Sequence, residues 1–194
     1  MTDKIRILQE QLGTIIKGKK EVTDKIIMAV LAKGHVLLED VPGVGKTTTA
    51  LALSRLMGMD FQRIQFTPDV VPSDVTGFTM YQKETGTFVY RPGVVMCNFL
   101  LADEINRTSS KTQAALLEVM EEGRVTVDGE THEVPKPFVV LATENPVGSS
   151  GTQMLPESQL DRFMVSLSMG YPDHESLVEI LRDRQDTNPL DHAE

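Results

Sequence analysis

The sequence predicts an α/β protein: an αβα sandwich built on a five-stranded, mostly parallel sheet with helices on both faces. Short apolar runs of strand length alternate along the chain with segments whose apolar residues recur at helical spacing. Such strand–helix–strand units place successive strands parallel, because each helix crosses over one face of the sheet. The chain has 194 residues, of which 40% are hydrophobic. One main core, and hence one principal domain, is expected.

The first third of the chain contains one such unit after two helices. Apolar residues at helical spacing predict the opening helices over residues 5–16 and 22–31, before Gly34. Gly58 ends the next predicted helix. The strand, helix and strand of this unit are expected over residues 35–39, 46–57 and 61–66.

Residues 67–98 form the least regular segment, which prolines and glycines interrupt, and we interpret it as a loop that carries a hairpin. The runs NFLLADE, FVVLATEN and FMVSLSM predict three further strands, with a helix over residues 109–122 after the first. A second hairpin is expected around Asp128-Gly129, a pair that favours a tight turn. The run HESLVEILRDR predicts a last helix capped by Asp173.

Composition excludes several classes of protein. The net charge of −9 argues against general affinity for nucleic-acid backbones. A single cysteine, Cys97, cannot form a disulfide framework and is expected to be a small buried apolar residue. The polar N-terminus does not resemble a signal peptide, no apolar run is long enough to span a membrane, and the four histidines lack metal-ligand spacing. We therefore expect a cytoplasmic protein.

The stretch LLEDVPGVGKTTTA runs from a predicted strand through a glycine loop into a helix. Gly43 and Gly45 let the backbone approach a phosphate group and direct its N–H groups at it. Lys46 can reach the outer phosphates, and the hydroxyl of Thr47 can ligate Mg²⁺. The general phosphate-loop pattern has glycine where this chain has Asp40. A glycine turn without a ligand is the alternative interpretation.

Two carboxylates, Asp103 and Glu104, end the apolar run NFLLADE. A carboxylate at the end of a neighbouring strand helps to hold Mg²⁺ in phosphate-loop enzymes, which suits Asp103. A second carboxylate can polarise an attacking water, whereas a kinase has to exclude water. The pair therefore favours hydrolysis over phosphoryl transfer. A solvated acidic strand end is the alternative.

Five blocks of the sequence resemble the MoxR family of AAA+ ATPases, and the similarity covers about residues 18–172. They are LLEDVPGVGKTTTA, RIQFTPDVVPSDVTG, LLADEINRTSSKTQAALLEVMEEGRVTVDG, VLATENP and LPESQLDRFMVSLSMGYP. The resemblance implies an AAA+ phosphate-loop NTPase core over residues 1–172. It also implies a homo-oligomeric ring, usually of six subunits, that binds ATP and Mg²⁺ at the junction between neighbours.

The resemblance assigns roles to individual residues. Asp103 and Glu104 match the Walker B pair, Asn145 the sensor that places water near the γ-phosphate, and Arg162 the arginine finger that reaches a neighbour's nucleotide. Gly18 and Lys19 match a region that packs against adenine. The Walker A motif supplies the phosphate-binding residues Pro42, Gly43, Val44, Gly45, Lys46, Thr47 and Thr48, with Thr47 and Asp103 at the metal.

Structural alternatives remain open for several of these residues. Asn145 precedes proline and suits a turn, and Arg162 could form a surface ion pair with Asp161. Arg107 could contact a neighbouring subunit or simply lie on the surface. Gly18 and Lys19 could belong to a plain helix linker.

The resemblance also implies two inserted segments and a further domain. Val75–Tyr90 would be the helix-2 insert and Arg124–Val134 the pre-sensor-1 hairpin, both directed at the ring axis or at a client, although solubilising loops are the alternative. Family members continue into a helical lid with a second sensor arginine. We expect residues 173–194 to be its start or a polar tail, so that the lid is largely absent.

Three functions follow from these expectations. The first is an ATP-driven, chaperone-like motor that remodels protein clients, often proteins with von Willebrand factor A domains in this family. The second is a scaffold that binds nucleotide without hydrolysing it. The third, a DNA-acting motor, is disfavoured by the acidic composition.

Overall fold

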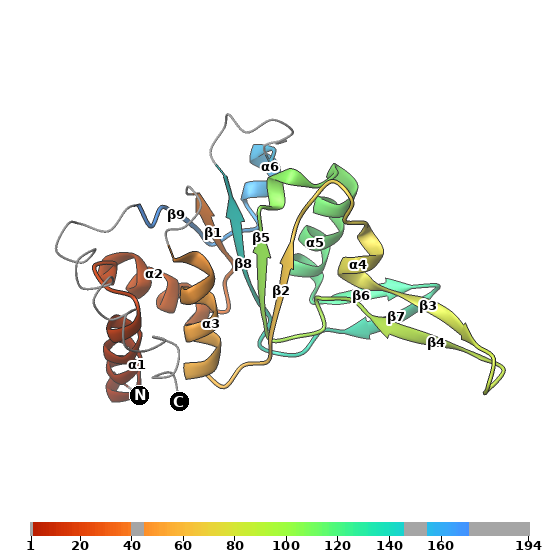
Figure 1. Cartoon of the computed structure of the whole chain (residues 1–194), viewed down its shortest axis with the longest axis horizontal. Coiled ribbons are helices and arrows are strands. Elements are labelled where there is room, and N and C mark those ends of the chain that lie inside the picture. The colour runs from red at the N-terminus through yellow and green to blue at the C-terminus, as the bar shows by residue number, and fades with distance from the viewer. Residues whose placement is uncertain (1, 40–44, 146–154, 171–194) are drawn as a thin grey trace, which may run out of the picture.

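The computed structural model describes residues 2–39, 45–145 and 155–170, and it confirms the predicted αβα sandwich. Five strands form the central sheet in the order β2-β5-β8-β1-β9, and every pairing in it is parallel (Figure 1). The strands are β1 (Val36–Glu39), β2 (Phe61–Gln65), β5 (Phe99–Asp103), β8 (Val139–Glu144) and β9 (Val165–Leu167).

Helices cover both faces of this sheet because its central strands are apolar on both sides. Val36 and Leu38 of β1 pack with the helices on one face, whereas Leu37 packs with those on the other. The first group of helices is α1 (Thr2–Ile15), α2 (Lys20–Leu31) and α3 (Lys46–Leu56), and on the other face lies α5 (Ser110–Glu122) (Figure 1). The chain therefore has two apolar cores separated by the sheet.

Helix boundaries follow local signals in the sequence. The hydroxyl of Ser109 accepts a hydrogen bond from the Thr112 amide and caps α5, which Gly123 ends in a left-handed conformation. Gly58 has φ +62° just beyond α3, as expected for a glycine that follows a helix. The 3-10 turn η1 (Ile105–Arg107) follows β5. The short helix α6 (Glu157–Leu160) precedes β9.

Both predicted hairpins are present, and they lie beside the short helix α4 (Pro72–Thr76) and α5 (Figure 1). The first pairs β3 (Gly77–Gln82) with β4 (Thr87–Pro92), and the second pairs β6 (Arg124–Val127) with β7 (Glu130–Glu133). Asp128 and Gly129 form the second turn with φ of +50° and +83°, which agrees with the expected tight turn. The rings of Tyr90 and His132 stack at 3.8 Å and join the two hairpins.

The boundary predicted for the first insert is wrong at its start. Val75 is buried in a short helix, α4 (Pro72–Thr76), and the hairpin begins only at Gly77. Proline suits the first turn of a helix, and the carboxylate of Asp74 accepts a hydrogen bond from the Val71 amide at 2.9 Å. These local contacts form one helical turn in a segment whose prolines and glycines suggested a loop.

The predicted last helix, with Asp173 as its cap, and the expected lid or tail over residues 173–194 lie outside the described residues. Across the part of the chain that the structure describes, no helix is long and apolar enough to cross a membrane. Cys97 is buried, as expected, and burial raises the pKa of its thiol to about 12.

Candidate active site

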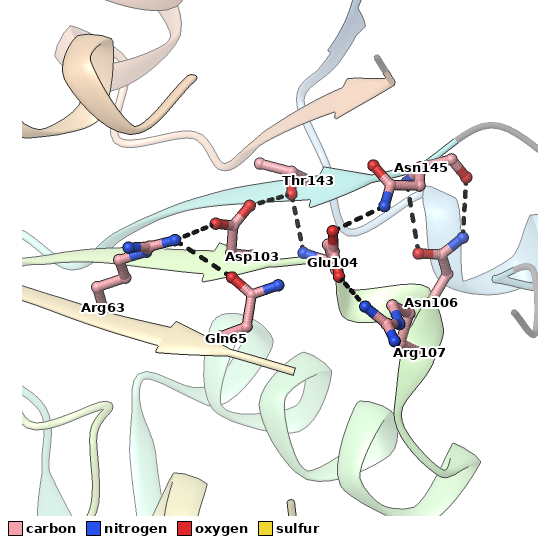
Figure 2. Close-up of polar contacts among 8 residues, drawn as sticks. All are labelled: Arg63, Gln65, Asp103, Glu104, Asn106, Arg107, Thr143 and Asn145. Atoms are coloured by element: carbon pink, nitrogen blue, oxygen red, sulfur yellow. Dashed lines mark hydrogen bonds and ion pairs between the residues drawn. The ribbon is translucent and has the colours of Figure 1, made fainter. Parts of the chain in front are cut away.

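The candidate site lies at the carboxyl edge of the sheet, where β5, β8 and β1 end next to one another. β5 ends at Asp103, β8 ends at Glu144, and β1 ends at Glu39 before the segment that leads into α3. Parallel strands end at the same edge, so residues distant in the sequence meet there. Figure 2 shows the resulting network of eight polar side chains.

Asp103 is held on both carboxylate oxygens. Its Oδ1 accepts a hydrogen bond from the Thr143 hydroxyl at 2.6 Å, and its Oδ2 accepts one from the Arg63 guanidinium at 2.7 Å (Figure 2). Arg63, half-exposed on β2, also donates to Gln65 Oε1 at 3.2 Å. The carboxylate is thereby fixed at the sheet edge as an acceptor.

Arg63 and Thr143 were not recognised as site residues from the sequence. The alternation of Phe61, Arg63 and Gln65 along β2 was a usable signal, because it places Arg63 and Gln65 on the same face of a strand. The pairing of Gln65 with Asp103 then brings that face to the acidic pair. Nothing in the local sequence distinguishes Thr143 from an ordinary strand residue.

Glu104 follows the strand in a left-handed backbone conformation, with φ +56° and ψ +48°. Its amide donates to the Thr143 hydroxyl at 2.8 Å. Its carboxylate accepts from Asn145 Nδ2 at 2.8 Å on one oxygen and from the Arg107 guanidinium at 2.7 Å on the other (Figure 2). Such turns cost free energy for a residue other than glycine, so surrounding contacts have to stabilise this one.

The electrostatics of Glu104 favour its ionised form. Burial alone would raise its pKa, but the hydrogen bonds from Arg107 and Asn145 and the charge of Arg107 outweigh burial and the nearby Asp103. The net result is a lowered pKa. A carboxylate that is ionised near neutral pH can accept a proton, because each of its hydrogen-bonded oxygens keeps a second lone pair.

Asn145 and Asn106 bond to each other through side chain and backbone. Asn106 Nδ2 donates to the Asn145 carbonyl at 3.0 Å, and its Oδ1 accepts the Asn145 amide at 3.5 Å (Figure 2). Asn106 is fully buried, and no pattern in its own segment marks it as a site residue. Asn145 Oδ1 is buried and has no hydrogen-bond partner among the described residues, so it can accept a hydrogen bond from a bound molecule.

A further carboxyl group, that of Glu144, lies beside Asn145 at the end of β8. It is buried, and it pairs in register with Glu39 of β1. Burial raises its pKa, the neighbouring Glu39 raises it further, and a hydrogen bond from the Leu155 backbone opposes both. The neutral form of Glu144 is therefore favoured more than is usual for glutamate, which limits negative charge at this edge.

The described part of the glycine loop begins at Gly45, since Pro42, Gly43 and Val44 lie outside the described residues together with Asp40. Gly45 has φ +94°, a conformation that side chains disfavour, and directly precedes α3. Lys46 is buried at the first position of that helix, followed by the half-buried Thr47 and Thr48. A helix N-terminus of this kind provides N–H groups for an anion.

The donor set fits a nucleotide with a divalent cation. Mg²⁺ prefers oxygen ligands, and Thr47 and Asp103 offer a hydroxyl and a carboxylate. Lys46 and the N-terminus of α3 offer positive charge for phosphate. No cluster of three or more histidine, cysteine or acidic residues suited to a metal exists among the described residues, so a cation here would rely on phosphate oxygens for further ligands.

The other predicted site residues lie outside this network. Arg162, which lies two residues beyond the end of α6, pairs with Glu121 of α5 at 2.8 Å rather than with Asp161. Lys19 is buried, and its ammonium donates to the Gly170 carbonyl at 3.0 Å, which links the start of α2 to the segment after β9. Gly18 has φ +68° between α1 and α2. These contacts neither require nor exclude the assigned roles.

Comparison with known proteins gives a consistent picture. The family described as "ATPase family associated with various cellular activities (AAA)" matches residues 35–165. Uncharacterized protein YeaC of Bacillus subtilis is 54% identical over 185 residues, which are 95% of this chain and 58% of that protein. Chaperone MoxR1 of Mycobacterium tuberculosis is 47% identical over 171 residues, 88% of this chain and 45% of that protein.

A solved structure from Cytophaga hutchinsonii, of a protein provisionally described as an ATPase, superimposes with a TM-score of 0.85 at 39% identity. The match covers 98% of this chain and 62% of that one. This chain thus spans about half the length of the curated relatives that it matches.

Proposed function

Because the chain belongs to the AAA family of ATPases, in its MoxR group, we propose that it binds ATP with Mg²⁺ and hydrolyses it to ADP and phosphate. The observation that carries this proposal is the placement of Glu104. Its carboxylate lies at the carboxyl edge of the sheet, is oriented by a hydrogen bond from Asn145 Nδ2 and is adjacent to Asp103. That arrangement suits the activation of a water molecule.

The phosphate-binding half of the site is proposed from α3 and β5. Lys46 would reach the outer phosphates, and the N–H groups of the loop from Pro42 to Thr48 would surround them. Thr47 and Asp103 would hold Mg²⁺, whose charge offsets that of the phosphates. Asp103 would have to exchange its contact with Arg63 for the cation, because that guanidinium occupies Oδ2 in the structure.

The water-activating half would consist of Glu104 and Asn145. Asn145 donates to Glu104 through Nδ2, which leaves its Oδ1 available to accept a hydrogen bond from the same water. Each Glu104 oxygen keeps a second lone pair, but the Arg107 guanidinium stabilises the ionised carboxylate and weakens it as a base, and this contact is the more exposed of the two. Arg107 is therefore the contact that we expect to break, since exposed ion pairs are weak.

The MoxR relatives extend the proposal beyond the single chain. Residues 1–172 would form the AAA+ core of a homo-oligomer, a ring of six subunits by the family resemblance, in which Arg162 acts on a neighbour's nucleotide. Gly18 and Lys19 would lie near the adenine. One relative is named a chaperone, and we propose that this chain likewise remodels protein clients, with von Willebrand factor A domain proteins as candidates.

A nucleotide-binding scaffold is the second candidate, and one observation favours it. Both Glu104 oxygens and both Asp103 oxygens are already bound within the chain. If ATP binding left the Arg107 contact intact, Glu104 would remain a weak base, and the site would hold nucleotide with little activation of water.

The substitution Glu104→Gln separates the two candidates. The amide cannot accept a proton as a base, so ATP binding should persist while phosphate release falls by about a hundredfold or more. Glu130→Gln, a change at an exposed position on β7, is the matched control. Lys46→Ala should weaken ATP binding itself. Phosphate release at the background rate from the unaltered protein, with ATP still bound, would support the scaffold.

A further inference from the structure

We propose that Thr143 is the positioning residue of the candidate site: its single hydroxyl fixes the side chain of Asp103 and the backbone of Glu104 together. It donates to Asp103 Oδ1 at 2.6 Å and accepts from the Glu104 amide at 2.8 Å (Figure 2). A hydroxyl has one proton and two lone pairs, so one group can perform both tasks. This inference rests on the proposed function, because it concerns how the two carboxylates are held for it.

Burial separates Thr143 from the two arginines of the network. Thr143 is fully buried, whereas the side chains of Arg63 and Arg107 are 45% and 42% exposed. The exposed guanidinium contacts can be exchanged for solvent, a cation or a phosphate at little cost. A hydroxyl enclosed in the protein keeps its partners, because a buried polar group that loses them is strongly penalised.

The position of Thr143 in the sheet explains why a side chain is needed there. The ladder between β5 and β8 ends with the pair Ala102 and Ala142. Beyond that pair the chain turns at Glu104 into the left-handed conformation that begins η1. The Thr143 hydroxyl then takes the Glu104 N–H, so β8 continues to direct the chain after the regular ladder has ended.

A buried threonine that merely satisfies its own hydroxyl would not need these partners, since a strand threonine can bond to a neighbouring carbonyl. Here both partners belong to the adjacent acidic residues of the candidate site. The geometry also links them: a shift of the Glu104 backbone would disturb the hydroxyl that orients Asp103. Thr143 therefore sets the relative placement of the metal-binding and water-activating carboxylates.

The test compares Thr143→Val, which removes the hydroxyl while keeping the shape, with Thr143→Ser, which keeps the hydroxyl. Thr126→Val is the control, because the Thr126 hydroxyl bonds to Thr131 on an exposed hairpin. Three quantities are measured: hydrogen exchange of the Glu104 amide without nucleotide, the affinity for a fluorescent ATP analogue with Mg²⁺ or with EDTA, and kcat and KM for ATP.

In Thr143→Val the Glu104 amide should exchange about tenfold faster or more, and the gain in nucleotide affinity from Mg²⁺ should shrink by about tenfold. The value of kcat should fall by at least about tenfold with a smaller change in KM. Thr143→Ser should keep the amide exchange rate, the Mg²⁺ dependence and the kcat of the unaltered protein. Thr126→Val should also leave these quantities unchanged. If Thr143→Val does not fold, Thr143→Ala against Thr143→Ser isolates the hydroxyl in the same way.

Two results would overturn the proposal: unchanged amide exchange and Mg²⁺ dependence in Thr143→Val, or equal impairment of the Ser and Val variants. Failure of the proposed hydrolysis has a different signature. In that case the unaltered protein releases no phosphate above background, while the amide exchange still reports whether Thr143 holds the turn.

Discussion

His35 links three elements at the centre of the molecule, and its substitution gives the sharpest test of the fold. The Val140 amide of β8 donates to His35 Nδ1 at 3.0 Å. That bond fixes the tautomer, so Nε2 carries the proton and donates to the Met120 carbonyl of α5 at 3.1 Å. The imidazole is buried in the neutral form. Its loss would leave two buried backbone groups without partners.

The magnitude follows from these two groups. Each stranded backbone group costs about 1–3 kcal/mol, so His35→Ala should lower the free energy of unfolding by about 2–6 kcal/mol. Two further variants each keep one of the two hydrogen bonds. In His35→Asn the amide oxygen can replace Nδ1 as the acceptor for Val140, and in His35→Gln the amide nitrogen can replace Nε2 as the donor to Met120. Each should cost about half as much.

The pH dependence provides an independent check. Burial lowers the pKa of His35, and the hydrogen bond to Met120 opposes this only in part. As the pH falls below about 6.5 the unfolded chain takes up a proton that the folded chain resists, so the contribution of neutral His35 is complete above that pH and is lost below it.

Urea denaturation of the unaltered protein and the three variants, followed by circular dichroism between pH 8 and pH 5, measures both effects. The advantage of the unaltered protein over His35→Asn should shrink as the pH falls. A constant advantage across this range, or a His35→Ala midpoint equal to that of the unaltered protein, would refute the reasoning.

Three further predictions concern other parts of the chain. Arg162→Ala should bind nucleotide but be inactive alone, and mixing it with Lys46→Ala should restore part of the ATPase rate if Arg162 acts in trans; no recovery would contradict that role. Cys97, with a thiol pKa of about 12, should not react with Ellman's reagent at pH 8 until urea unfolds the protein, and rapid labelling of the folded protein would contradict its burial. Gly93→Ala should lower the melting temperature, because its Cβ would overlap the backbone of α4 and β3, whereas Gly13→Ala on α1 meets no neighbour within 4 Å and should not; equal melting temperatures would argue against the close packing.

The central strands and long helices were predictable because their signals are local. The apolar runs and helical spacing located all five strands, and Ser109, Gly58 and Asp128-Gly129 marked boundaries and a turn. The helix α4 was not predictable in this way. Its single turn is too short for periodicity, and Pro72 resembled a loop residue until its place at the helix start was known.

The same distinction between local and long-range signals applies to the residues of the candidate site. The carboxylates Asp103 and Glu104 could be selected from the sequence, because their chemistry and position at a strand end were visible there. Whether they serve catalysis as proposed remains a prediction. Asn106 and Thr143 could not be selected, because their importance lies in their contacts with residues about 40 positions away. The strand alternation placed Arg63 on one face with Gln65 but did not show its contact with Asp103.

The sequence by itself determined the class of fold, the glycine loop and the acidic pair, since each depends on residue type and spacing within one segment. Only the tertiary structure decided which hydrogen bonds and ion pairs the two carboxylates form. The parallel order β5-β8-β1 brings Thr143 and Asn145 beside Asp103 and Glu104, and η1 folds Arg107 back onto Glu104. Hydrogen bonds act only over about 3 Å, so such contacts exist only after the strands have been assembled in their order.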